Sequence, residues 1–310
     1  MELPRYAFFE GKIVPFQNAK ISILTHALNY GTGAFGGLRG YWNPEHQQLY
    51  LFRPGDHYRR LLNSARLLLM NFDYQPEDLT RITHELLREE GFQRDVYIRP
   101  LVYKSDAGIG VRLHDLQEEL AITAVPFDRY VNRDTDAHVT ISSWRRIDDN
   151  VIPARGKITG AYANSAFIKT DAVLAGFDEA LVLNQDGHLS EGSAENVFLL
   201  RDGVLITPPV TDNVLEGITR RTLLTIARKT LNLEVKERPI DRTEIYLAQE
   251  LFLTGTAAQI TAVTRVDHRP IGKGSMGPVT RQLRTYFNQL VRGELEEHRE
   301  WLSGVYPAEK

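Results

Sequence analysis

The chain has 310 residues, of which 42% are hydrophobic and 25% charged, and its formal net charge is −3. This length suits two domains of ordinary size, and the composition is typical of a globular protein. Basic and acidic residues are interspersed, which excludes the basic surface that binding to nucleic acid or an anionic membrane requires. Cysteine is absent, which excludes disulfides, thiolate metal ligands and cysteine nucleophiles. We therefore expect small-molecule partners.

The N-terminal segment lacks a basic stretch followed by an apolar one. No run in the chain approaches the roughly 18 apolar residues that a membrane span needs. These patterns predict a cytoplasmic protein that does not enter a membrane.

The first part of the chain predicts a smaller α+β domain over residues 1–125. Two hairpins are expected, over 7–16 with a Glu-Gly turn and over 39–52 with an Asn-Pro turn. Helices are expected from about Asp56 to Met70 and from Pro76 to a stop at Gly91. The first helix should bury an apolar face made of Leu61, Leu62, Ala65, Leu68 and Leu69. Strands are expected over 96–104 and 119–127.

The second part predicts a larger α/β domain over residues 138–310, after a polar interdomain loop over 126–137. A buried strand is expected over 138–144, and a helix between Lys157 and Gly176. Two hairpins with Asp-Gly turns are expected over 179–192 and 196–209, followed by a helix that begins at Gly217.

Lys157, in the glycine-bounded run GKITGAYANS, is the candidate covalent catalyst. A lysine amine condenses with an aldehyde to a Schiff base, and desolvation favours its neutral form. Glu191, in LSEGSAENVF, is the candidate partner of a protonated pyridine nitrogen, with Glu195 as its rival. Taken singly, a lysine or a glutamate in such a segment is more often a solvated surface charge.

Two segments predict anion sites suited to a phosphate. Gly217, Ile218 and Thr219 begin a helix whose free amide groups and dipole attract an anion, although a simple helix cap explains them equally well. The run LTGTAAQIT offers backbone amides and hydroxyls around Thr256. Arg60 is the expected cation, with Arg59 as the alternative. Together with Lys157 and Glu191, these sites match pyridoxal 5'-phosphate.

In order along the chain, the runs ILTHALNYGTGAF, GKITGAYANS, LSEGSAENVF, LEGITRR and FLTGTAAQIT resemble those of the fold-type IV pyridoxal-phosphate aminotransferases. The similarity extends over almost the whole chain and is strongest to the branched-chain amino acid aminotransferases. It implies a two-domain α/β fold with the cofactor in a cleft.

The resemblance also implies residue roles. Lys157 would form the Schiff base and later carry the proton, Glu191 would pair with the pyridine nitrogen, and Tyr162 would hydrogen-bond the phenolic oxygen. Implied for the rest of the cofactor site are Arg60, Leu215, Gly217, Ile218, Thr219 and Thr256. Implied for the substrate are Tyr30, Phe35, Arg39, Tyr97, Arg99, Tyr130, Thr256 and Ala257. Tyr130 belongs to the interdomain loop, which such enzymes can contribute across a dimer interface, and core filling is the alternative for the aromatic residues.

One position departs from the family pattern. Branched-chain enzymes show Phe-Glu-Gly-x-Arg, whereas this chain has Phe35-Gly36-Gly37-Leu38-Arg39. The missing acidic side chain predicts a different polar network and a roomier pocket, as in transaminases that accept (R)-amines. The run DAGIGV over 106–111 keeps the branched-chain pattern and favours ordinary 2-oxo acids.

The predicted activity is transfer of the amino group of leucine, isoleucine or valine to 2-oxoglutarate by a ping-pong mechanism. Amino acids and 2-oxo acids are the expected partners, and a homo-oligomer, either a dimer or a hexamer of dimers, is the expected assembly. The alternatives are (R)-amine or D-amino acid transamination, aminodeoxychorismate lyase activity, and a non-catalytic binding protein. No histidine spacing predicts a metal site.

Overall fold

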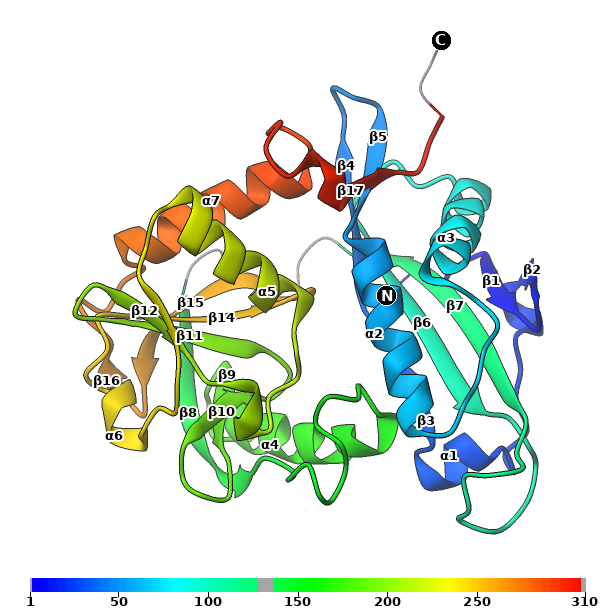
Figure 1. Ribbon diagram of the computed structural model, residues 1–310, viewed down its shortest axis with the longest axis horizontal. Coiled ribbons are helices and arrows are strands. Elements are labelled where there is room, and N and C mark those ends of the chain that lie inside the picture. The colour runs from blue at the N-terminus through cyan, green and yellow to red at the C-terminus, as the bar shows by residue number, and fades with distance from the viewer. Residues whose placement is uncertain (1, 128–135, 308–310) are drawn as a thin grey trace. The chain divides into compact units, whose positions relative to one another are not determined.

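The computed structural model describes residues 2–127 and 136–307, which form two compact units (Figure 1). Unit 1 comprises Met1–Asp128, Gly156–Gly160 and Asn288–Lys310, and unit 2 comprises Arg129–Arg155 and Ala161–Phe287. The first passage between the units lies in the predicted interdomain loop. The continuous second domain expected over 138–310 differs from this division, because two of its segments belong to unit 1. The reason is strand pairing: Ile158 forms a bridge with Ala34, and the last strand pairs with an early one.

Unit 1 contains an antiparallel sheet in the order β17-β5-β4-β6-β7-β1-β2, with β3 paired to β6. Its strands are β1 (Tyr6–Phe9), β2 (Lys12–Pro15), β3 (Gly33–Phe35), β4 (Leu38–Asn43), β5 (Gln48–Phe52), β6 (Val96–Lys104), β7 (Glu118–Pro126) and β17 (Leu302–Gly304). Both predicted hairpins are confirmed. In the first, Glu10 and Gly11 take φ values of 48° and 77°, the pair that a tight hairpin turn requires.

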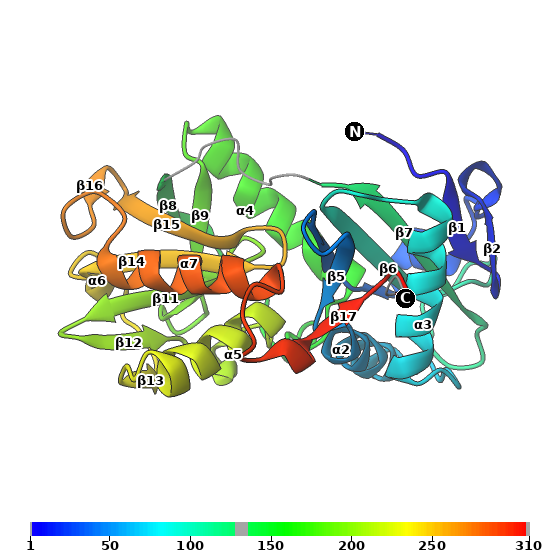
Figure 2. The ribbon, with the colours of Figure 1, turned by 90° about the horizontal axis from the view of Figure 1, so that it is seen from above.

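Two long helices, α2 (Pro54–Leu67) and α3 (Pro76–Glu90), pack side by side against this sheet (Figures 1 and 2). The boundaries of α3 agree with the prediction, because Pro76 opens it, Gln75 and Asp78 form a capping box, and Gly91 ends it at a φ of 68°. The expected burial of Leu69 is wrong: its side chain is 61% exposed, since α2 has already ended and Leu69 lies at a φ of 53°. The shorter helices are η1 (Phe16–Asn18), α1 (His26–Tyr30) and η5 (Arg299–Trp301).

Unit 2 contains a mixed sheet in the order β10-β9-β8-β15-β14-β11-β12-β13, with β16 paired to β15. Its strands are β8 (Asp136–Arg145), β9 (Glu179–Leu183), β10 (Leu189–Gly192), β11 (Asn196–Arg201), β12 (Val204–Thr207), β13 (Val235–Glu237), β14 (Glu250–Gly255), β15 (Gln259–Val266) and β16 (Arg269–Pro270). Strand β8 runs parallel to β9 and β15. The two predicted Asp-Gly hairpins are confirmed as β9–β10 and β11–β12. An antiparallel sheet in one unit and a mixed sheet in the other agree with the predicted α+β and α/β classes.

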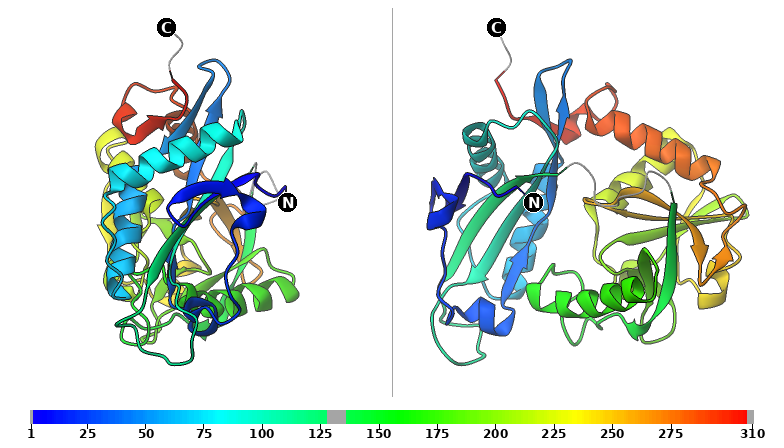
Figure 3. Two further views of the ribbon diagram at one scale, coloured as in Figure 1. Left: turned by 90° about the vertical axis from the view of Figure 1, so that its right-hand side faces the viewer. Right: turned by 180° about the vertical axis from the view of Figure 1, so that it is seen from behind.

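Helix α4 (Tyr162–Leu174) lies along β8 and β9 (Figure 3) and buries Ile168 and Ala172 against Ala180 and Val182. Helix α5 (Ile218–Thr225) contacts β14 and continues as a π-helical turn over Ile226–Thr230. The other helices are η2 (Thr159–Ala161), η3 (Val210–Asp212), α6 (Arg242–Ile245) and α7 (Pro278–Val291). Within the described ranges, none of the helices combines the length and the apolar character that a membrane crossing needs.

Candidate active site

Lys157 is held in unit 1 through its backbone. Its amide donates a hydrogen bond to the Ser64 hydroxyl at 3.1 Å, and its carbonyl accepts one from the Phe35 amide at 3.0 Å. The Ser64 hydroxyl in turn donates to the Arg60 carbonyl at 2.9 Å. The Lys157 ammonium nitrogen lies 5.0 Å from the centre of the Phe35 ring. Three predicted site residues, Arg60, Phe35 and Lys157, are therefore brought together.

The segment that carries Lys157 also depends on a close glycine contact. The Gly160 amide donates to the Gly31 carbonyl, and a β-carbon on Gly31 would lie 2.7 Å from the Gly160 Cα. Gly31 also takes a φ of 67°, which disfavours any other residue. The two predicted motifs around residues 30 and 157 are thus joined backbone to backbone.

Arg99, Phe35 and Tyr97 form a second group on unit 1. The Arg99 guanidinium lies 4.6 Å from the Phe35 ring centre and donates to the Tyr97 hydroxyl at 3.1 Å. Arg99 is exposed, while both rings are partly buried. This arrangement offers a cation and a hydroxyl beside an apolar ring, which is what binding both a carboxylate and an aliphatic side chain requires.

Arg39 has a different environment. Its side chain is 3% exposed, donates to the Phe127 carbonyl at 3.1 Å and lies 3.5 Å from Asp95. Phe127 packs against Tyr97 with ring centres 5.3 Å apart. The sequence suggested that Arg39 contacts the substrate directly. Its burial favours an indirect role instead, in which Arg39 holds Phe127 against the Tyr97 ring.

Gly36 does not lie beside an empty space. A β-carbon on Gly36 would approach the Pro100 ring to 2.7 Å. A side chain at position 36 would therefore require the Pro100 ring to shift, and the roomier pocket expected from the missing acidic side chain stays a prediction. Tyr30, in α1, accepts a hydrogen bond from the Gly110 amide at 3.0 Å, which joins it to the DAGIGV segment.

Glu191 is the centre of a buried polar network in unit 2. One carboxylate oxygen pairs with the Arg146 guanidinium at 2.9 Å. The other accepts from the Leu215 amide at 3.1 Å and from the Asn196 side-chain amide at 3.3 Å. Both members of the ion pair are less than a tenth exposed. A carboxylate held this way presents a fixed negative charge, as a protonated pyridine nitrogen requires.

The same network reaches the start of α5. Asn196 donates to the Leu215 carbonyl at 2.9 Å, and its side-chain oxygen would overlap a β-carbon on Gly217. Gly217 is the N-cap residue of α5 and has no side chain with which to cap this end of the helix. The Arg221 amide bonds back to the Gly217 carbonyl, as the first turn of a helix requires. The amides of Ile218 and Thr219 precede that bond and can therefore face an anion.

The turn between β14 and β15 carries Thr256 and Ala257. Thr254, at the end of β14, pairs with Asn196 of β11, so this turn lies next to the Glu191 network. Tyr162 is the first residue of α4 in the same unit. Tyr130 lies outside the described residues. Unit 2 thus gathers a carboxylate, a helix start and a second backbone turn, which fits the ring nitrogen and phosphate of the predicted cofactor.

The two pairs of rival residues differ in their environments. Arg59 is exposed and pairs with Asp56 at 3.1 Å, whereas Arg60 is partly buried on the Ser64 side of α2. Glu195 has no cation within ion-pair distance among the described residues, whereas Glu191 has Arg146. Both comparisons favour the residues preferred from the sequence.

Sequence reasoning missed three supporting residues: Ser64, Arg146 and Asn196. Ser64 and Arg146 lie far along the chain from their partners Lys157 and Glu191. Asn196 lies in the same motif as Glu191. The segment SAEN could have indicated Asn196, since an asparagine at a strand start often bonds neighbouring backbone. No sequence signal indicated Ser64 or Arg146.

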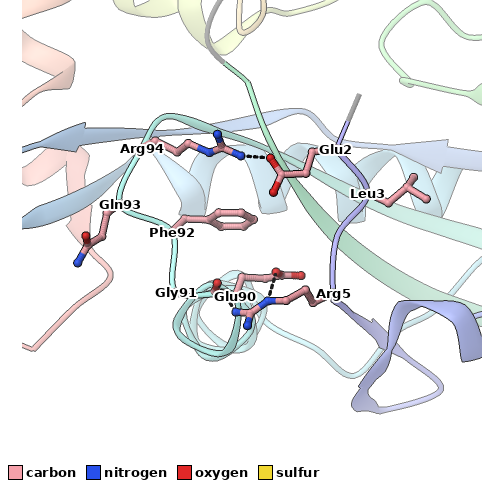
Figure 4. A pocket seen from close by; sticks show the side chains of 8 residues that line it. All are labelled: Glu2, Leu3, Arg5, Glu90, Gly91, Phe92, Gln93 and Arg94. Atoms are coloured by element: carbon pink, nitrogen blue, oxygen red, sulfur yellow. Dashed lines mark hydrogen bonds and ion pairs between the residues drawn. The ribbon is translucent and has the colours of Figure 1, made fainter.

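A separate recess of about 280 Å³ lies in unit 1, between the N-terminal segment and the end of α3 (Figure 4). The predicted site residues that the structure describes all lie elsewhere. Its two arginines, Arg5 and Arg94, are paired with Glu90 and Glu2, and the Phe92 ring lies between the two pairs. These contacts are those of a docked terminal segment.

Comparison with known proteins identifies the family. Residues 34–266 match the model of the amino-transferase class IV family. A probable branched-chain-amino-acid aminotransferase of Aquifex aeolicus is 48% identical over 301 residues, which cover 97% of each chain.

Solved structures are similar as well. That of the branched-chain aminotransferase of Thermoproteus uzoniensis with norvaline is 40% identical, covers 98% of this chain and 100% of its own, and has a TM-score of 0.94. A T.th. branched-chain amino acid aminotransferase complexed with N-(5'-phosphopyridoxyl)-L-glutamate is 40% identical, with coverage of 98% and 99% and a TM-score of 0.92. The chain therefore belongs to the class IV aminotransferases, pyridoxal-phosphate enzymes of fold type IV, and within them it is close to the branched-chain amino acid aminotransferases.

Proposed function

We propose that this aminotransferase moves the amino group of leucine, isoleucine or valine to 2-oxoglutarate by a ping-pong mechanism. The observation that carries the proposal is the group of Phe35, Tyr97 and Arg99 in the same unit as Lys157. The rings suit an aliphatic side chain, and the guanidinium and hydroxyl suit the second carboxylate of glutamate. The solved relatives carry norvaline in one case and a glutamate adduct of the cofactor in another.

When bound, pyridoxal phosphate supplies an aldehyde and an electron-withdrawing ring. Lys157 would be the residue that binds this aldehyde, and its amine would move the proton at the substrate Cα. Glu191, fixed by Arg146, would keep the ring nitrogen protonated. Tyr162 would donate to the phenolic oxygen. The amides of Ile218 and Thr219 and the Thr256 turn would hold the phosphate in unit 2, and Arg60 of unit 1 would supply its cation.

The residue assignment is tested by borohydride reduction of the holoenzyme followed by peptide mapping. We expect the label on Lys157, and none in Lys157→Ala, while Lys12→Ala, an exposed lysine on β2, should label as the unaltered protein does. A label on another lysine would overturn the assignment.

The reaction is tested with two half-reactions. Leucine alone should change the visible absorption of the holoenzyme and release one equivalent of the branched 2-oxo acid, and later addition of 2-oxoglutarate should yield glutamate. D-amino acids and (R)-1-phenylethylamine should react much more slowly. Equal rates with these amines, or release of pyruvate from aminodeoxychorismate without glutamate formation, would overturn the proposed substrate class.

We also propose a cytoplasmic homo-oligomer. Support comes from apolar side chains that are exposed on α1 and its neighbouring loop, namely Ile23, Leu28, Ile109 and Val111. Hydrogen bonds of His26 and Tyr30 to residues 106 and 110 hold the two segments together. An exposed patch of this kind on a globular protein commonly contacts another subunit. Ile109→Asp should lower the molar mass measured by light scattering, and an unchanged mass would exclude this surface.

A further inference from the structure

Glu195 differs from the other buried glutamates of the described residues in having neither an oppositely charged partner nor more than one hydrogen-bond donor to its carboxyl group. Glu179 pairs with Lys169 at 2.6 Å, Glu191 pairs with Arg146, and Glu250 accepts from the Thr280 amide and hydroxyl. Glu195 is 6% exposed, and within the described residues its carboxyl group accepts a single hydrogen bond, from the Ala194 amide at 3.1 Å. A buried carboxylate with a single donor is unfavourable, and such a group keeps its proton instead.

The chain is built closely around this side chain. A β-carbon on Gly192 would lie 2.9 Å from a Glu195 carboxyl oxygen and 3.3 Å from the Glu195 carbonyl oxygen, so the Glu195 side chain would have to shift to admit it. The Gly192 amide closes the turn by donating to the Glu195 carbonyl at 2.6 Å. On the other side, the Glu195 Cγ lies 3.9 Å from the β-carbon position of Gly255. The side chain therefore lies between the Glu191 segment and the turn that carries Thr256.

The charged groups that act on Glu195 come from neighbouring strands and a helix. Burial, followed by the negative charge of Glu179, raises the pKa of Glu195 to about 8, and Glu191 acts in the same direction. The Ala194 amide and Lys169 oppose this change and are outweighed. Arg146 is bound to Glu191 and so does not act as a counterion of Glu195.

We propose that Glu195 is a positioning residue that is uncharged when the cofactor is bound, and that its ionisation in alkaline solution weakens the hold of unit 2 on the cofactor phosphate. The proposal rests on the proposed placement of the phosphate near Thr256 and the start of α5. A new negative charge beside the Thr256 turn would repel the phosphate in a buried, weakly screened setting. The neutral acid exerts no such repulsion.

The test compares the dissociation constant of pyridoxal phosphate for the unaltered protein and for Glu195→Gln between pH 6.5 and 9. The amide mimics the uncharged acid, so the two constants should agree within about twofold at pH 6.5. At pH 9 the unaltered protein should bind at least about fivefold more weakly than the variant, because one pH unit beyond the pKa ionises most of the acid. Effects of pH on the cofactor and on Lys157 are common to both proteins and cancel in the ratio.

Thermal unfolding of the two holoenzymes supplies an independent measurement. Because the pKa is raised from its ordinary 4.5 to about 8, the folded protein keeps a proton that the unfolded chain has lost, and stability falls as the pH rises from about 4.5 to about 8. The melting temperature should therefore decline more steeply in the unaltered protein than in Glu195→Gln. Glu179→Gln removes the strongest neighbouring negative charge and should move the transition to lower pH, so it remains informative if Glu195→Gln folds poorly.

Two results would overturn the proposal. A ratio of dissociation constants that stays constant with pH would show that Glu195 does not ionise in this range. Loss of cofactor binding in Glu195→Gln at every pH would mean that Glu195 acts as a carboxylate and competes with Glu191 for the ring nitrogen. Borohydride labelling of Lys157 and glutamate formation by the unaltered protein at pH 7 test the proposed function separately. A failure of the proposed function can therefore be told apart from a failure of the Glu195 proposal.

Discussion

The surroundings of Lys157 and of Glu191 hold their functional groups in opposite ways. Lys157 is fixed through its backbone, by Ser64 and Phe35, and its amine lies over an aromatic ring. Glu191 is fixed through its side chain, by a guanidinium and two amide donors that are largely buried. A group that must leave and return needs a firm backbone and a movable side chain, whereas a group that supplies a constant charge needs a rigid carboxylate. Substitutions around Lys157 should therefore lower the reaction rate, and substitutions around Glu191 should lower the free energy of unfolding.

Lys157→Ala should have the largest effect on turnover and a small effect on folding. Removing both the covalent attachment and the proton carrier should lower the transamination rate by at least roughly a thousandfold. Because the residue's backbone contacts remain, the free energy of unfolding of the cofactor-free protein should change by less than about 1 kcal/mol. Denaturant unfolding and glutamate formation measure the two quantities. A large loss of stability would show that the side chain itself holds the segment.

Arg146→Met should have the largest effect on stability. It leaves the Glu191 carboxylate buried without its cation, which costs about 3–5 kcal/mol. Urea unfolding measures this loss. In the double variant with Glu191→Gln, part of the stability should return, because the unpaired charge is gone. If the two substitutions were simply additive, the ion pair would not be the source of the effect.

Gly217→Ala should perturb the cofactor side more mildly. The added β-carbon overlaps the Asn196 side-chain oxygen, and Asn196 must shift away from Glu191 and Leu215. We expect a loss of about 1–3 kcal/mol in unfolding free energy, together with weaker cofactor binding measured by titration. Gly55→Ala in α2 is the matched control, because apart from the adjoining residues and the backbone of its own helix no described atom lies within 4 Å of its β-carbon position. Equal effects of the two would exclude the proposed overlap.

Ser64→Ala should have the smallest effect of the four substitutions. It tests whether the backbone contact of Lys157 with Ser64 positions the amine. The Lys157 amide loses its acceptor, which costs about 1–2 kcal/mol, and the Arg60 carbonyl loses a donor. Turnover should fall severalfold, since the backbone beneath Lys157 is less fixed. An unchanged rate with leucine and 2-oxoglutarate would mean that the other backbone contacts of the segment, at Phe35 and Gly31, position it without Ser64.

Local signals in the sequence were sufficient to predict most elements and to single out the candidate chemical groups. Helix α3 is defined by a proline, a capping box and a terminal glycine, all within the helix or one residue beyond it. The first hairpin follows from a pair of turn residues that accept positive φ. Lys157, Glu191 and the start of α5 could be singled out because amine, carboxylate and glycine-rich helix start each have a chemistry of their own.

The tertiary structure decided which residues support those groups. Arg146 and Ser64 act through partners far along the chain, at Glu191 and Lys157, and no periodicity links such positions. The same holds for the assignment of Gly156–Gly160 to unit 1 and for Pro100 beside Gly36. The sequence also did not indicate that Glu195 would be buried without an ion-pair partner among the described residues.

Turn and helix signals depend on neighbouring residues, whereas these contacts depend on how distant strands pack. The sequence by itself therefore determined the elements and the reactive groups. Packing alone determined which buried charges are paired and which acid is left neutral, because burial and counterions come from segments that are remote in the chain.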